Sequence, residues 1–341
     1  MNKIFKLIIS LFLFSLATLS INGQTYSGNV FLRNQFDVDT FSASGWQIID
    51  GNLDINGFNT PDSEKVNDLS GLSSISSING RLLLIFSSFP DLNGLRNLTS
   101  LGNRLDIRAN EFLENINGLN GLITIEDRLD ISENILLQDI SLANLQSVRQ
   151  GILINLNPEL RQIGGFENLQ FVGGSIDIKS NSKLATINGF NSLQSIQGFL
   201  SFDSHELLEE IVGLENLASV RGNFAISNNI ALSTISGLKN LKSISGFISI
   251  DNNDNLLNLN ELEEIEVIGS SIFITKNEKI MNIDALNMIT SIAGLRINEN
   301  TNLQNINGLS NLGVVNGRLE INNNPILTDC CSIAQLIDGD N

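Results

Sequence analysis

One short motif, G-x-L-x-I with close variants, recurs along most of the 341-residue chain. From Leu82 onward each copy follows the previous one by 23 or 24 residues. A fixed period of this length is typical of a solenoid, in which a coil buries its apolar face only when a neighbouring coil stacks on it. We therefore expect a mainly β solenoid of about 12 coils, whose motifs start at Leu53, Leu82, Leu105, Leu129, Ile152, Ile176, Leu200, Phe224, Ile248, Ile272, Leu295 and Leu319.

Within each repeat the first apolar residue of the motif, here called position 0, is followed by another apolar residue at position +2. This alternation predicts a strand with every second side chain turned inward, and equivalent strands of successive coils should pair in parallel and in register. Halfway round the repeat, the G-L-x-N-L segments fit either a tight helical turn or a second short strand. Five extra residues around Thr60–Ser63 should bulge from one coil without breaking the stack.

The two ends of the sequence differ from the repeats. Lys3 and Lys6 precede an apolar run at 7–19 that is short for a bilayer span, so residues 1–23 are predicted to be a secretory signal peptide, with a membrane anchor as the alternative. We expect an N-terminal cap at 24–50, repeats at 51–329 and a partial C-terminal cap at 330–341 that contains Cys330 and Cys331. The protein should then be secreted or held at a cell surface, with no transmembrane segment after cleavage.

Position +5 is asparagine in nine of the ten repeats from Leu105 onward, and His205 occupies the remaining one. An amide offers both a donor and an acceptor, so stacked copies can bond to turns and to the next coil. We predict a structural ladder made of Asn110, Asn134, Asn157, Asn181, Asn229, Asn253, Asn277, Asn300 and Asn324. A row of ligand contacts is the less favoured interpretation.

These residues carry a resemblance to a known family. The run I-x-G-x-L-x-I-x-x-N-x-x-L-x-x-I-x-G-L-x-N-L, which starts for example at Ile196 and at Ile244, resembles the receptor L-domain repeat, a relative of the leucine-rich repeats, over about residues 51 to 333. The resemblance implies a right-handed parallel β-helix or leucine-rich-repeat-like solenoid, placement outside the cell, and binding rather than catalysis. It carries over no catalytic residue, and the cysteine-rich modules of the receptor members have no counterpart here.

The net charge of the chain restricts which class of partner it can bind. The formal net charge is −17, and loss of two lysines with the signal peptide would make it −19. A nucleic acid would be repelled, so we expect an extracellular glycan or protein as the partner. The oxygen-rich segment Asp251–Asn255 could hold Ca²⁺ but lacks the spacing of an EF-hand loop. We predict no cofactor and no metal site.

Candidate binding residues lie on either side of position 0, where side chains should point outward. Arg81, Arg104 and Arg128 should stack beside Asp106 and Asp130 as ion pairs between coils, which makes either a solvated face or a polar groove for a glycan or peptide.

Further along the chain, Phe199, Phe247 and Phe273 should also point outward. They make either a docking patch or a covered part of the core.

Three functions fit these features. The favoured one is an adhesion-type protein that binds a macromolecule, and the second is a structural envelope protein without a defined ligand. The third is a carbohydrate-active β-helix enzyme that uses Asp106, Asp130 and Asp177 with Arg104 and Arg128. Because these carboxylates occupy the same position of different repeats, repetition alone accounts for them, and we predict that the protein is not an enzyme.

Overall fold

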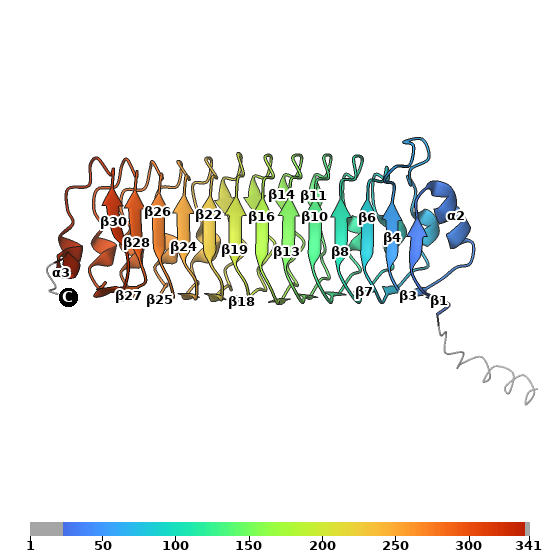
Figure 1. Cartoon of the computed structure of the whole chain (residues 1–341), viewed down its shortest axis with the longest axis horizontal. Helices are drawn as coiled ribbons and strands as arrows, with labels where there is room; N and C mark the ends of the chain where they lie inside the picture. Colours follow the sequence, from blue (N-terminus) through green and yellow to red (C-terminus); the bar gives the residue numbers. More distant parts are fainter. Residues whose placement is uncertain (1–22, 338–341) are drawn as a thin grey trace, which may run out of the picture.

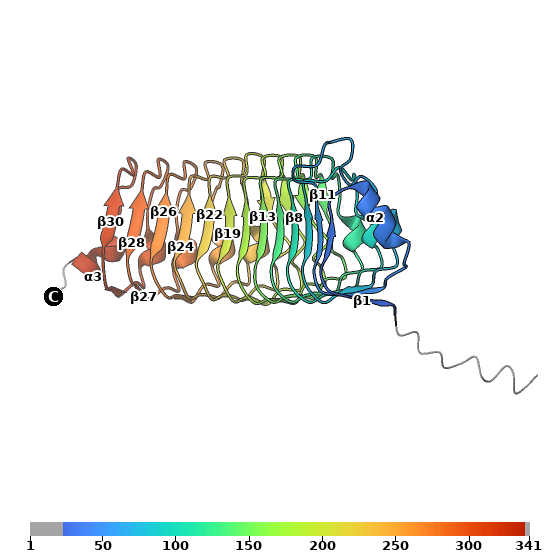
Figure 2. The same cartoon turned by 45° about the vertical axis from the view of Figure 1, so that its right-hand side comes forward.

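The computed structural model describes residues 23–337, which form a straight stack of coils (Figures 1 and 2). The fold is mainly β, and all of its strand pairs are parallel, as the period predicts. The signal peptide predicted at 1–23 lies almost wholly outside the described residues.

The longest sheet faces the viewer in Figure 1 and contains 13 strands. Each strand pairs with its equivalent in the next coil, for example Leu105 with Leu129 and Leu129 with Ile152. The strands are β2 (Val30–Leu32), β4 (Leu53–Asn56), β6 (Leu82–Ile85), β8 (Leu105–Arg108), β10 (Leu129–Ser132), β13 (Ile152–Asn155), β16 (Ile176–Lys179), β19 (Leu200–Asp203), β22 (Phe224–Ser227), β24 (Ile248–Asp251), β26 (Ile272–Thr275), β28 (Leu295–Asn298) and β30 (Leu319–Asn322). We call its outer surface the strand face.

A second side of each coil is a short strand just before the long one. Eleven of these strands form one sheet and two more form another. They are β1 (Thr25–Ser27), β3 (Ile48–Asp50), β5 (Ser77–Ile78), β7 (Ser100–Leu101), β9 (Thr124–Ile125), β12 (Ser147–Val148), β15 (Phe171–Val172), β18 (Ser195–Ile196), β21 (Ser219–Val220), β23 (Ser243–Ile244) and β25 (Val267–Ile268), followed by β27 (Ser291–Ile292) and β29 (Val314–Val315).

The third side, built around the G-L-x-N-L segments, takes both of the conformations that the sequence allowed. Most coils have a 3-10 turn there, but four central coils have a short strand instead. In two of these four coils a glycine with a positive φ follows the strand, Gly165 at 69° and Gly213 at 75°. The elements are η1 (Ser70–Leu72), η2 (Asn93–Leu95), η3 (Asn117–Leu119), β11 (Asp139–Ile140), β14 (Gln162–Ile163), β17 (Thr186–Ile187), β20 (Glu210–Ile211), η4 (Ser236–Leu238), η5 (Asn260–Leu262), η6 (Asp284–Leu286), η7 (Asn307–Leu309) and η8 (Cys331–Ile333).

The glycine of the 3-10 turn allows neighbouring coils to approach closely. A Cβ built on Gly118 would lie 1.9 Å from the carbonyl oxygen of Leu92 in the preceding coil. Gly118→Ala should therefore force the two coils apart and lower the free energy of unfolding by about 1–3 kcal/mol. Chemical denaturation measures this loss, and Gly313→Ala is the matched control, because its Cβ would meet no atom closer than 3.9 Å.

The asparagines at position +5 form a continuous ladder inside the turns. All of them from Asn110 to Asn300 are fully buried. In each rung the side-chain oxygen accepts the backbone N–H of the equivalent residue in the preceding coil, as Asn157 Oδ1 does from Asn134 at 3.1 Å. The side-chain Nδ2 donates to a strand carbonyl, as to Ile131 at 3.0 Å. Buried polar groups in the turns are thereby satisfied from coil to coil.

The ladder also fixes an unfavourable backbone conformation. The residue before each ladder position, at position +4, has a positive φ although it is not glycine, as in Ala109 (52°), Leu156 (54°) and Lys276 (57°). This left-handed conformation costs roughly 1–2 kcal/mol per residue. The hydrogen bonds of the next residue in the sequence hold it in place.

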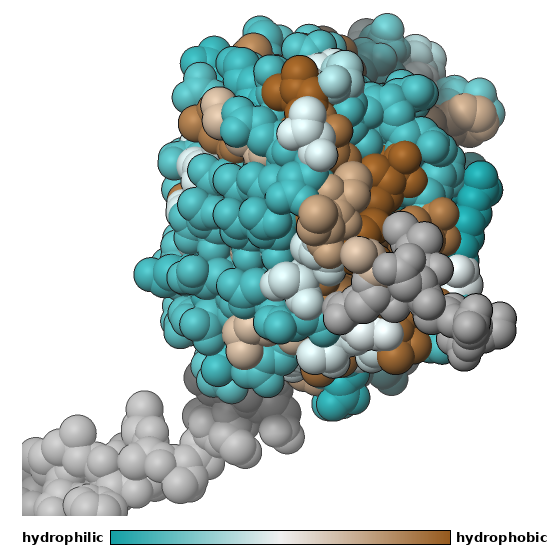
Figure 3. Space-filling model, turned by 90° about the vertical axis from the view of Figure 1, so that its left-hand side faces the viewer, coloured by the Kyte–Doolittle hydropathy of each residue, from teal (hydrophilic) through white to brown (hydrophobic). Residues whose placement is uncertain are grey.

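The two ends depart from the coil pattern. Residues 24–50, expected to be a cap, already contribute β1, β2 and β3 to the sheets, and only α2 (Gln35–Ser42) covers the first coil, with Val38 fully buried. At the other end α3 (Ala334–Ile337) follows η8, and Ile333 is buried. Figure 3 views this end and shows hydrophobic side chains reaching the surface among hydrophilic ones.

Candidate binding surface on the strand face

The strand face presents three rows of outward side chains, at positions −1, +1 and +3 of every coil. In the register of the sheet each residue lies beside its equivalents in neighbouring coils, about 4.8 Å away. Along this face three regions follow one another from the N-terminal end: a groove at the first coils, a charged strip, and a region with exposed phenylalanines.

The charged strip consists of Asp106 on β8 and Asp130 on β10, with Arg104 and Arg128 directly before these two strands. Arg104 Nε lies 2.7 Å from Asp106 Oδ2, and Arg128 lies 3.1 Å from Asp130 Oδ2. These pairs form within one strand, whereas we expected them between coils. The expected adjacency of like charges does occur, because Asp106 and Asp130 are register partners.

A pair between coils does form next to this strip. Arg81 binds Asp54 of the preceding coil through two hydrogen bonds, of 2.9 and 2.6 Å. A fork of this kind matches the planar guanidinium to both carboxylate oxygens.

Burial keeps the two carboxylates of the strip away from solvent. Asp106 has no solvent exposure and Asp130 only 3 %, because they lie beneath the arginine side chains. Burial raises the pKa of Asp106, while Arg104 and Arg108 partly oppose this shift. Only the arginines of the strip reach solvent.

The aromatic region is more open. Phe199 on the loop before β19 is 39 % exposed, and Phe247 and Phe273 are partly buried. The rings of Phe247 and Phe273 meet edge to face at 5.6 Å, and the Arg296 guanidinium lies 5.7 Å from the Phe273 ring centre. None of the three is buried in the core.

Phe199 and Phe247 border one shallow groove of about 340 Å³, which we call the aromatic basin. Its floor contains small residues, Ser201 and Ala225, and its lining also includes Asp203. Two coils separate the two rings, which corresponds to roughly 9.6 Å along the stack. Phe273 is not part of this lining.

The polar side of the aromatic basin is held by hydrogen bonds. Asp203 accepts from Asn228 Nδ2 at 2.9 Å and from the Ser204 hydroxyl at 3.0 Å. Asp177 pairs with Lys179 at 3.1 Å. The basin therefore combines fixed acceptors with exposed aromatic carbon.

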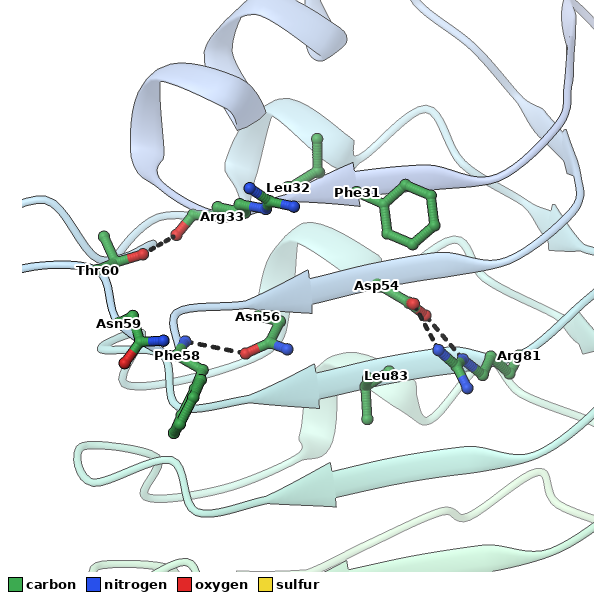
Figure 4. A pocket seen from close by; sticks show the side chains of 10 residues that line it. All are labelled: Phe31, Leu32, Arg33, Asp54, Asn56, Phe58, Asn59, Thr60, Arg81 and Leu83. Atoms are coloured by element: carbon green, nitrogen blue, oxygen red, sulfur yellow. Dashed lines mark hydrogen bonds and ion pairs between the residues drawn. The ribbon is translucent and has the colours of Figure 1, made fainter.

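The groove at the first coils was not predicted from the sequence. It has a volume of about 510 Å³ and is bordered by Phe31 on β2 and Phe58 on the loop after β4 (Figure 4). We call it the N-terminal groove. A signal was present, because Gly28-x-Val30-x-Leu32 matches the repeat motif 23 residues before Leu53, so that Phe31 takes an outward position.

The remaining predicted site residues have structural partners. His205 lies in the ladder, and its Nδ1 accepts the Asn181 N–H at 3.2 Å. Asp251 of the oxygen-rich segment accepts a hydrogen bond from the Thr275 hydroxyl. Across residues 23–337 no group of three or more histidine, cysteine or acidic side chains is placed to hold a metal ion.

No protein-family model matches the chain, and no curated protein matches it in sequence. The geometry agrees with a repeat fold like that of the leucine-rich repeats, with a spacing of about 24 residues. Among the described residues, no helix is long and apolar enough to cross a membrane.

Proposed function

We propose that the protein is a secreted or cell-surface binding protein of the receptor L-domain type, and that it captures an extracellular glycan on its strand face. The observation that carries this proposal is the aromatic basin, where Phe199 and Phe247 border one groove over a floor of small side chains. An adhesion-type role follows if the glycan belongs to another cell or to a matrix.

The basin suits a sugar because it can contact both the apolar C–H face of a sugar ring and its hydroxyl groups. The ring carbons carry hydrogens that pack on an aromatic face, and the phenylalanines offer such faces at low entropic cost. The hydroxyl groups need fixed acceptors and donors. Each oxygen of Asp203 accepts one hydrogen bond within the protein and keeps a further lone pair for a sugar hydroxyl, and the Asp177–Lys179 pair adds a donor.

Burial of two of the three candidate carboxylates supports binding over hydrolysis, although the third, Asp177, is 21 % exposed and pairs with Lys179. A general acid or base must reach the glycosidic oxygen or a water molecule. Asp106 and Asp130 lie under Arg104 and Arg128 and are almost without exposure. The enzyme hypothesis would require these arginines to move aside first.

Replacement of both basin rings tests the proposal. Purified protein is mixed with a panel of insoluble and soluble extracellular polysaccharides, and both retention and the release of new reducing ends are followed. For the polysaccharide that is retained, Phe199→Ala with Phe247→Ala should weaken binding at least about tenfold. No new reducing ends should appear.

Phe171→Ala is the matched control, because Phe171 is 42 % exposed but lies on β15 of the second sheet. It should bind as the unchanged protein does. If the double variant bound as tightly as the unchanged protein, the basin would not be the glycan site. If the unchanged protein retained no polysaccharide, the purely structural role would be favoured. New chain ends that vanish in Asp130→Asn would show an enzyme.

A further inference from the structure

The N-terminal groove lies on the same face as the aromatic basin but seven strands away, and its chemistry is different. Phe31 is 58 % exposed and Phe58 is 60 % exposed. The Phe58 ring rests against Phe86 of the next coil, with ring centres 5.3 Å apart, and so keeps a fixed orientation. Figure 4 shows Phe31, Phe58 and Leu83 on the outer side of the strands around one hollow.

The loop inserted after β4 forms one wall of this groove. The Thr60 hydroxyl donates to the Arg33 carbonyl at 3.1 Å, which ties the loop to β2. Lys65 and Asp62 pair at 2.8 Å within the loop. Of the inserted loop, the first part, as far as Thr60, therefore lines the groove.

Hydrogen-bond donors predominate in the groove. Both oxygens of Asp54, the one carboxylate of its lining, are taken by Arg81. Asn56 uses its oxygen to accept the Phe58 N–H at 2.9 Å, and its amide nitrogen makes no bond within residues 23–337. The guanidinium of Arg33 also has no partner among these residues, and it borders the groove.

The charge of the groove is opposite to that of the molecule. Asp54 and Arg81 cancel, so Arg33 leaves a local positive charge on a chain of net charge −17. Asp37, whose Oδ2 accepts the backbone N–H of Arg33 at 2.8 Å, keeps its negative charge but lies outside the lining of the groove. An unpaired arginine beside exposed rings selects a planar anion that is attached to a ring.

We propose that the N-terminal groove binds a uronic acid unit of an acidic polysaccharide, whose carboxylate pairs with Arg33 and whose ring packs on Phe31 or Phe58. A sugar is favoured over an acidic peptide, because two separate aromatic faces and free amide donors match a ring with hydroxyl groups. This inference goes beyond the glycan proposed for the aromatic basin, and it stands if the basin binds nothing.

Direct binding measurements test this site. The probes are polygalacturonate, polyglucuronate and alginate, each compared with the same polymer after reduction of its carboxyl groups. We expect the protein to bind at least one acidic polymer, with an affinity that falls as salt is raised. Arg33→Gln should weaken this binding about 10- to 100-fold and leave binding to the reduced polymer unchanged.

Matched variants separate charge from ring contact. Phe31→Ala should weaken binding to both the acidic and the reduced polymer, whereas Phe36→Ala should weaken neither, because Phe36 is 76 % exposed on α2 and lies outside the groove. Arg221→Gln is the control for the loss of one positive charge elsewhere on the surface.

Several results would overturn the inference. Failure of all three acidic polymers to bind would do so, and so would an Arg33→Gln variant that binds as tightly as the unchanged protein. If polyglutamate bound through Arg33 and the sugars did not, the ligand would be an acidic peptide. The Phe199→Ala, Phe247→Ala double variant is measured in parallel with the same acidic polymers. It shows whether a loss of binding arises at the aromatic basin or at the N-terminal groove.

Discussion

Asn157→Ala should lower the free energy of unfolding by about 3–5 kcal/mol, among the largest losses expected for one residue outside the apolar core. The change removes the acceptor of the Asn134 backbone N–H and the donors to the Ile131 and Asn155 carbonyls. These groups are buried in the turn, where water cannot replace the lost partners. Denaturant unfolding followed by circular dichroism measures the loss.

Two further variants separate the ladder from general effects of substitution. Asn155→Ala, two residues away, removes a side chain with no hydrogen bond in the described structure and should cost less than about 0.5 kcal/mol. Asn157→His should keep most of the stability at pH 7.5, because His205 already occupies one ladder position. Equal losses for Asn157→Ala and Asn155→Ala would show that the ladder bonds contribute little.

The coil and its ladder could be predicted because the same residue pattern recurs in every repeat. A strand position recurs as Leu105, Leu129 and Ile152, so inward direction and register follow from the period alone. The conformation halfway round the coil could not be predicted, because both alternatives bury the same apolar residues. A glycine with a positive φ follows the short strand in two of the four coils that have it, as Gly165 and Gly213, so these glycines do not account for all four.

The candidate sites were less predictable, because they depend on residues that do not repeat. The pairing of Arg104 with Asp106 inside one strand depends on side-chain rotamers, and these are not visible in a spacing. The N-terminal groove combines two phenylalanines that only the folded chain brings together. Phe31 belongs to β2, a strand before the first coil that the motif predicted, and Phe58 belongs to the inserted loop. The outward positions of the phenylalanines did follow from the strand period.

His205 shows how one histidine replaces an asparagine in the ladder. Its Nδ1 accepts the Asn181 N–H at 3.2 Å, and its Nε2 lies 3.1 Å from the Ile178 carbonyl, to which it donates. The neutral ring thus reproduces the acceptor and the donor of an amide. A protonated ring would lose the acceptor and would place a charge in a fully buried turn, so burial lowers the pKa of His205 from 6.5 to about 4.

Because the pKa of His205 is lowered in the folded chain, this one residue should make the protein less stable in mild acid. As pH falls from 6.5 to about 4, the unfolded chain takes up a proton at His205 that the folded chain does not, so the free energy of unfolding falls by about 3 kcal/mol at most. His205→Asn restores a uniform ladder of asparagines and removes this pH-dependent loss of stability. The variant should match the unchanged protein near pH 7.5 and gain about 2 kcal/mol over it at pH 5. Carboxylates titrate in both proteins, so the difference between their free energies of unfolding across pH isolates His205. A difference independent of pH would contradict the prediction, because it would mean that His205 has the same pKa in the folded and the unfolded chain.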